Sequence, residues 1–117
     1  MKTDNIIVDK SKSFAIRVIK LYKYLVEEKR EFVLSKQLLR SGTSIGANIK
    51  EAVRGQSKAD FAAKMNIALK EVSETEYWLE LLHETDFLTD QQFDSIYSDC
   101  HALIKILMSI VKTSRNE

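Results

Sequence analysis

Two short patterns in the chain place carboxyl, imidazole and thiol groups close together. Glu80-Leu81-Leu82-His83 has the Glu-x-x-His spacing with which a helix presents ligands to a di-iron centre. Such a centre needs this pattern on two helices and an inward Glu from each of the other two. The sequence contains the pattern once, and the first amphipathic segment has no inward Glu, so we do not expect a di-metal centre.

Cys100 and His101 form the second pattern, a thiol beside an imidazole. Nucleophilic catalysis needs the two groups in contact and held by a third residue, but neighbours on a helix point in different directions. Cys100 lies on an apolar stripe, where a free Cys behaves as a small apolar residue. No glycine-rich phosphate loop is present either. We therefore expect a protein that binds and does not catalyse, with no metal, no cofactor and no small-molecule substrate.

Four amphipathic segments must position the polar side chains. Apolar residues at spacings of three and four predict helices over about residues 11–28, 36–54, 58–84 and 90–114. In the third segment the 4,3,4,3,4,3 spacing from Phe61 to Leu82 is typical of a bundle seam. Short connections make consecutive helices antiparallel neighbours. The prediction is an all-α protein, a single domain over residues 1–117 folded as an antiparallel up-down-up-down four-helix bundle.

Local signals mark where these helices begin and how closely they pack. Ser35 and Ser57 are candidate N-caps, and Thr89 with Gln92 forms a capping-box pattern. Gly42 and Gly46 lie inside the second helix, where each costs about 1 kcal/mol relative to Ala. We expect a neighbouring helix to approach closely at these two glycines.

Composition agrees with a helical protein of the cytoplasm. The chain has no Pro and only three Gly, which favours long helices over a turn-rich fold. A single Cys cannot form an intramolecular disulfide, as is usual in a reducing compartment. The charged N-terminal segment is unlike a signal peptide, and no stretch approaches the roughly 20 apolar residues of a membrane span. We expect a cytoplasmic protein without membrane contact.

Charge is unevenly distributed along the chain, although the net charge is only +1. Residues 1–58 contain 13 Lys and Arg against 6 Asp and Glu, and residues 59–117 contain 5 against 11. One interpretation is that oppositely charged helices complement each other within or between subunits. The other is a nucleic-acid-binding surface on the first two helices, with these candidate phosphate contacts: Arg17, Lys20, Lys23, Lys36, Arg40, Lys50, Arg54 and Lys58.

Polar residues also interrupt the inward surface of the second helix. Because buried polar groups need hydrogen-bond partners, we predict an internal network that fixes the register of the helices. A functional polar pocket is the alternative. The predicted network consists of Arg40, Ser41, Ser44, Asn48 and Glu71.

The last two helices carry more apolar residues than one buried stripe requires. Several such residues along two helices indicate a second buried surface, and self-association is its simplest use. The alternative is a wide core that takes them all in. The predicted oligomer interface consists of Ile67, Trp78, Leu81, Ile106 and Met108.

Several blocks in the second and third helices resemble one known family. The blocks are Gln37-Leu38-Leu39-Arg40-Ser41, Ser44-Ile45, Asn48-Ile49-Lys50-Glu51-Ala52, Ile67-Ala68-Leu69-Lys70-Glu71 and Glu74-Thr75-Glu76-Tyr77-Trp78-Leu79. They are similar to the four-helix-bundle, ribosomal-protein-like proteins encoded in intervening sequences of bacterial 23S ribosomal RNA genes. The accessory protein of diversity-generating retroelements is a related member.

This resemblance carries expectations that the residues alone do not. It implies a ring of bundles, typically a homopentamer, with a basic surface suspected of binding nucleic acid. It implies no enzymatic activity and no cofactor. Two functions follow as hypotheses: an oligomer that binds RNA or other nucleic acid through helices one and two, or a protein-interaction scaffold with no nucleic-acid role.

Overall fold

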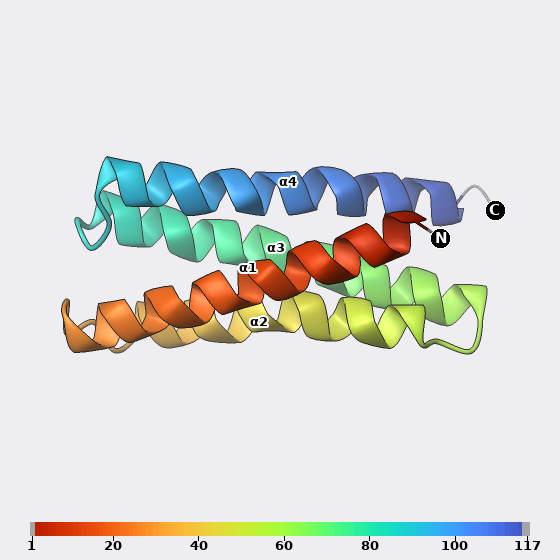
Figure 1. Cartoon of the computed structure of the whole chain (residues 1–117), viewed down its shortest axis with the longest axis horizontal. Helices are drawn as coiled ribbons and strands as arrows, with labels where there is room; N and C mark the ends of the chain where they lie inside the picture. Colours follow the sequence, from red (N-terminus) through yellow and green to blue (C-terminus); the bar gives the residue numbers. More distant parts are fainter. Residues whose placement is uncertain (1, 116–117) are drawn as a thin grey trace.

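Four antiparallel helices form a rod of 46 × 21 × 19 Å, which confirms the predicted fold class (Figure 1). The computed structural model describes the backbone of residues 2–115 and the side chains of residues 6–115. The helices are α1 (Lys2–Glu27), α2 (Leu34–Val53), α3 (Lys58–Glu84) and α4 (Asp90–Arg115). Both chain ends and the α2–α3 connection lie at one end of the rod, which we call the terminal end. The α1–α2 and α3–α4 connections lie at the other, the loop end.

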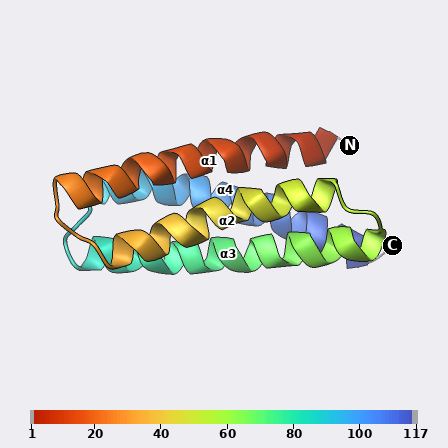
Figure 2. The ribbon, with the colours of Figure 1, turned by 90° about the horizontal axis from the view of Figure 1, so that it is seen from below.

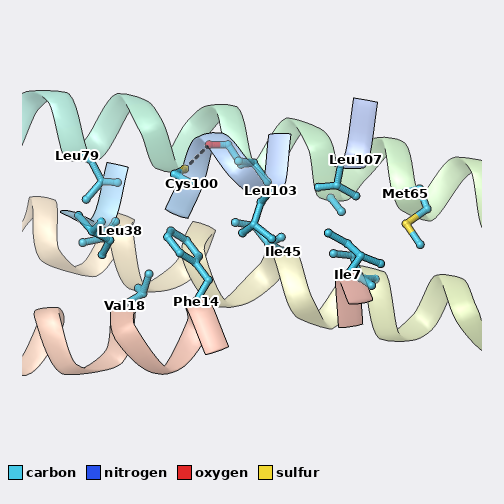
Figure 3. Packing of buried hydrophobic residues seen from close by; sticks show 14 of the residues in the cluster. Ile7, Phe14, Val18, Leu38, Ile45, Met65, Leu79, Cys100, Leu103 and Leu107 are labelled. Carbon is cyan, nitrogen blue, oxygen red and sulfur yellow. Dashed lines mark hydrogen bonds between the residues drawn. The ribbon is translucent and has the colours of Figure 1, made fainter. Parts of the chain in front are cut away.

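The core fills the space between the four helices with one apolar stripe from each (Figure 3). On α3 the predicted seam residues Met65, Ala68, Val72, Thr75, Leu79 and Leu82 are all buried. Phe61, the first residue of that pattern, is only partly buried because it lies beside the α2–α3 connection. The seven-residue repeat thus places α3 correctly between its neighbours α2 and α4.

Helix α1 begins at Lys2 and not near Ser11 as predicted. Ile7 is fully buried, and with Ser11, Phe14 and Val18 it continues the inward stripe toward the N-terminus. Burial of this stripe provides the stabilisation that a polar, charged segment lacks by propensity alone. The apolar pattern did not predict this extension because charged residues flank the short apolar run around Ile7.

Glu31, and not Ser35, caps the N-terminus of α2. The nearly buried Glu31 carboxylate accepts hydrogen bonds from the backbone N–H groups of Val33 at 3.2 Å, Leu34 at 3.0 Å and Ser35 at 2.7 Å. Ser35 lies within the helix, buried, and its hydroxyl donates to the Glu31 carbonyl oxygen at 2.8 Å. Arg30, at φ 56°, turns the chain so that Glu31 points back at the helix. The other predicted caps are confirmed, with Ser57 accepting from the Asp60 N–H and Thr89 exchanging hydrogen bonds with Gln92.

The close approach predicted at the two glycines brings α2 against α1. A Cβ atom added to Gly42 would lie 2.8 Å from both γ-methyl carbons of Val18, a distance that packed atoms do not tolerate. A Cβ atom on Gly46 would meet the Ser11 hydroxyl oxygen at 3.4 Å, an ordinary contact. Gly42 is therefore the position at which the α1–α2 packing requires the absence of a side chain.

The two glycines provide a matched pair of substitutions. We expect Gly42→Ala to lower the free energy of unfolding by about 1–2 kcal/mol, because overpacking against Val18 outweighs the gain in helix propensity. Gly46→Ala should be neutral or stabilising by up to about 1 kcal/mol, since only the propensity changes. Urea unfolding followed by circular dichroism measures both. Equal effects of the two substitutions would contradict the assignment of the close contact to Gly42.

Candidate nucleic-acid interface

Folding redistributes charge between the two ends of the rod. If each helix is divided at its midpoint, the terminal half contains residues 6–14, 44–71 and 103–115, with ten Lys and Arg against four Asp and Glu. The loop half, residues 15–43 and 72–102, contains seven against eleven. The terminal end is therefore basic and the loop end acidic.

This division separates the eight cations predicted to share one surface. Lys50, Arg54 and Lys58 lie in the basic terminal half. The other five, which are Arg17, Lys20, Lys23, Lys36 and Arg40, lie in the half where carboxylates predominate. The predicted site is thus two groups of cations, of which only the first lies in the half of the rod where Lys and Arg outnumber Asp and Glu.

Arg17 bridges α1 to α4 and does not face outward with Lys23. Its guanidinium lies 2.6 Å from the Asp99 carboxylate, and it donates to the hydroxyl and the carbonyl oxygen of Ser95 at 3.0 and 3.3 Å. Two hollows of about 310 and 460 Å³ flank it along the α1–α4 groove, and Lys20 lines the second. An exposed pair of this kind contributes at most about 1 kcal/mol, but it spans the least extensively packed side of the bundle.

Arg40 lies between two carboxylates of α3. It forms an ion pair with Glu74 and lies 3.6 Å from Glu71 Oε2, while Trp78 Nε1 donates to Glu74 at 3.0 Å. Both Arg17 and Arg40 therefore form ion pairs between helices, and these pairs reduce the availability of the two guanidinium groups to a phosphate group.

The remaining residues of the predicted polar network, Ser41, Ser44 and Asn48, do not bond to the Arg40 side chain. The hydroxyls of Ser41 and Thr75 lie 2.9 Å apart in the core, as a separate α2–α3 contact. Ser44 donates to the Arg40 carbonyl oxygen and Asn48 to the Ser44 carbonyl oxygen, both within α2. Residues spaced four apart can satisfy each other along their own helix, and the sequence pattern did not separate this outcome from a cross-helix network.

Burial raises the pKa of the Glu71 carboxyl group above its ordinary value. Arg40 lowers this pKa and Glu74 raises it further, and both effects are smaller than that of burial. Among the described residues, Glu71 Oε2 has no hydrogen-bond partner. The ionised form of Glu71 is thus incompletely compensated.

A basic hollow beside the α2–α3 connection collects cations from two helices. Lys50, Arg54 and Lys64 line a hollow of about 670 Å³ together with Glu51 and Asp60, and Lys64 lies 3.4 Å from Glu51. Lys58 lines an adjoining hollow with Gln56 and Ser114. Among the side chains that the structure describes, Lys50, Arg54 and Lys58 have no carboxylate in ion-pair contact.

Seven further cations of the terminal half were not among the predicted site residues. Charge counted along the sequence does not reveal them, because antiparallel folding brings the start of α1 and the end of α4 to the same end. Comparing the charge at each end of every predicted helix would have found them. The missed residues are Lys10, Lys12, Lys64, Lys70, Lys105, Lys112 and Arg115.

Glu80, His83 and His101, the polar members of the two short patterns in the sequence, take part in separate structural contacts. Tyr97 donates to Glu80 at 2.6 Å, whereas His83 lies 2.7 Å from Asp90. Stacked or edge-on rings link His83, Phe93, Tyr97 and His101 along the α3–α4 seam. Within residues 6–115 no group of three His, Cys, Asp or Glu side chains is placed to hold a metal ion.

Cys100 is fully buried among apolar side chains (Figure 3). Its thiol donates to the Val72 carbonyl oxygen at 3.8 Å. Burial raises the pKa of this thiol, which disfavours the nucleophilic thiolate. Cys100 thus packs as a small apolar residue.

The five residues predicted for self-association differ in exposure. Ile67 and Met108 are 40% and 56% exposed, whereas Trp78, Leu81 and Ile106 are partly buried. Trp78 and Ile106 pack against the core, so the wide-core alternative accounts for part of this set.

No described helix is long and apolar enough to cross a membrane.

The fold and its surface define the class of protein: an all-α, antiparallel four-helix bundle with one basic end. The model of the 23S rRNA-intervening sequence protein family matches residues 3–109, and the chain belongs to this family. The chain is also similar to the crystal structure of a protein with unknown function from the S23 ribosomal protein family of Bacteroides thetaiotaomicron VPI-5482. The two are 59% identical with a TM-score of 0.93, over 94% of this chain and 98% of that one. No curated protein matches.

The raised pKa of Glu71 predicts a pH-dependent effect of Glu71→Gln. A carboxyl group with a raised pKa in the folded state destabilises the fold once it ionises, so its cost is absent at acidic pH and appears as the pH rises through the unfolded and then the folded pKa. We therefore expect Glu71→Gln to increase the free energy of unfolding at pH 7 and to change it little below the ordinary pKa of 4.5. Urea unfolding at both pH values tests this. A loss of stability at pH 7 would show that the Arg40 pair outweighs burial.

Proposed function

We propose that this protein acts in the cytoplasm as a non-enzymatic, self-associating bundle that binds RNA through its basic terminal end. The observation that carries the proposal is the separation of charge along the rod, with ten Lys and Arg in the terminal half. Lys50, Arg54 and Lys58 are the predicted site residues that lie there. The association of the family with 23S ribosomal RNA supports RNA as the nucleic acid.

The contacts would come from side chains and not from helix termini. The Ser57 hydroxyl accepts from the Asp60 N–H at the start of α3, and the adjacent Asp60 carboxylate repels an anion. Lysine and arginine at the hollow beside the α2–α3 connection would instead neutralise phosphate groups. The described surface carries no base-reading motif, so recognition would follow the shape and charge of the RNA.

Self-association would multiply a modest basic surface. Ile67 and Met108 remain largely exposed in a single chain, as an interface residue would. The family resemblance favours five copies in a ring. Several basic ends on one particle would bind a single RNA with an affinity greater than any one end supplies.

Two double substitutions with equal change of charge test the RNA-binding surface. Lys50→Glu with Arg54→Glu reverses two charges at the terminal end, and Lys29→Glu with Lys36→Glu reverses two at the loop end. We expect the first variant to bind a short RNA hairpin roughly tenfold or more weakly at low salt, with a salt dependence reduced by about one to two phosphate contacts. The second variant should bind nearly as the unchanged protein does. Fluorescence anisotropy over a salt series measures both.

Three outcomes distinguish the alternatives. Equal loss in both variants would contradict the terminal end and favour a response to net charge alone. A larger loss in the loop-end variant would place the site at the loop end, around Lys36. No binding of the unchanged protein at low salt would reject the RNA function and favour the protein-interaction scaffold.

A further inference from the structure

Helix α1 presents an apolar pair on its outer surface within a cationic segment. Ile16 and Ile19 are 46% and 39% exposed on successive turns. Residues 10–26 contain five Lys and Arg and no Asp or Glu. We call this surface the α1 face. Exposed isoleucines bordered by lysines are suited to contact with an apolar, anionic surface.

Helix α3 presents a second apolar surface with the opposite charge. Tyr77 is 53% exposed, and Leu81, one turn closer to the helix end, is partly buried. Residues 71–86 contain six Asp and Glu and no Lys or Arg. We call the surface around Tyr77 and Leu81 the α3 face.

The two faces cannot cover each other within one chain. Figure 2 shows α1 and α3 on opposite sides of the bundle, and these helices do not contact each other. Each face therefore remains open to a second molecule. Two α1 faces would repel each other, as would two α3 faces, whereas unlike faces attract.

Internal ion pairs neutralise only part of this charge. Arg17 pairs with Asp99 and Glu74 with Arg40, while Glu76 lies 3.2 Å from His101. Among the described residues, Lys20, Lys23 and Glu84 have no ion-pair partner, and Glu80 is bonded only to the neutral Tyr97 hydroxyl. Both faces thus keep the charge that disfavours contact between two identical faces and favours contact between an α1 face and an α3 face.

We propose that the α1 face of one copy binds the α3 face of the next, so that the protein assembles head to tail through two different surfaces. The proposal rests on the self-association proposed above and names the surfaces that perform it. Such a heterologous contact closes into a ring when its rotation permits. It also uses Lys20 and Lys23 for assembly, while the terminal end stays available to RNA.

Complementation between two variants tests this arrangement. Ile19→Glu disables the α1 face, and Tyr77→Lys disables the α3 face; both side chains are exposed, so the fold should be retained, as checked by circular dichroism. We expect each variant alone to sediment as a monomer. Mixed in equal amounts, they should form a species of at least twice the 13.5 kDa chain mass, because the intact α3 face of the first variant binds the intact α1 face of the second. Val33→Glu, at the most exposed apolar residue of the α1–α2 connection, is the control and should assemble like the unchanged protein.

Each other outcome overturns a stated part of the proposal. If Ile19→Glu assembles while Tyr77→Lys does not, the α3 face pairs with itself, and the reverse result indicates pairing of α1 faces. If both assemble and only the control fails, another surface makes the contact. An unchanged protein that sediments as a monomer rejects the underlying self-association. The Lys50→Glu, Arg54→Glu variant should assemble normally, so a failure of RNA binding is measured separately from a failure of this pairing.

Discussion

The close approach of Val18 to Gly42 sets how closely α1 packs on α2. Helix α1 packs closely on α2 at this position, whereas its other side, toward α4, contains two hollows bridged by Arg17. The orientation of α1 therefore depends mainly on α2. That orientation directs Ile16 and Ile19 outward, buries Ile7 and Phe14, and brings Lys10 and Lys12 to the terminal end.

Periodic and local features of the fold were predictable because each depends on residues close in the chain. The α3 seam, the Ser57 cap and the Thr89–Gln92 box follow from spacings of three and four. Glu31 was not predictable in the same way. Its carboxylate caps α2 because Arg30 adopts a positive φ. This conformation is uncommon for residues other than glycine, so the sequence did not predict it.

The candidate site was harder to predict because it depends on which helix ends meet. Lys50 and Arg54 were identified from their charge, but Lys64, Lys105 and Lys112 lie in the same half of the rod, on α3 and α4. Arg17 and Arg40 were identified from their charge in the same way, yet carboxylates from other helices form ion pairs with them. Counting charged residues along the sequence does not reveal these ion pairs between helices, because they depend on the register in which the helices pack.

The basic terminal end and the acidic loop end make each bundle an electric dipole along its 46 Å axis. In the field of a polyanion such a molecule rotates before contact, so that the terminal end leads its approach. The rate of encounter would then exceed that of an uncharged rod of equal size, although the net charge is only +1. Dissolved ions shorten the range of this torque to about 8 Å at physiological ionic strength. Orientation, rather than total charge, would thus govern an encounter of this protein with a charged polymer.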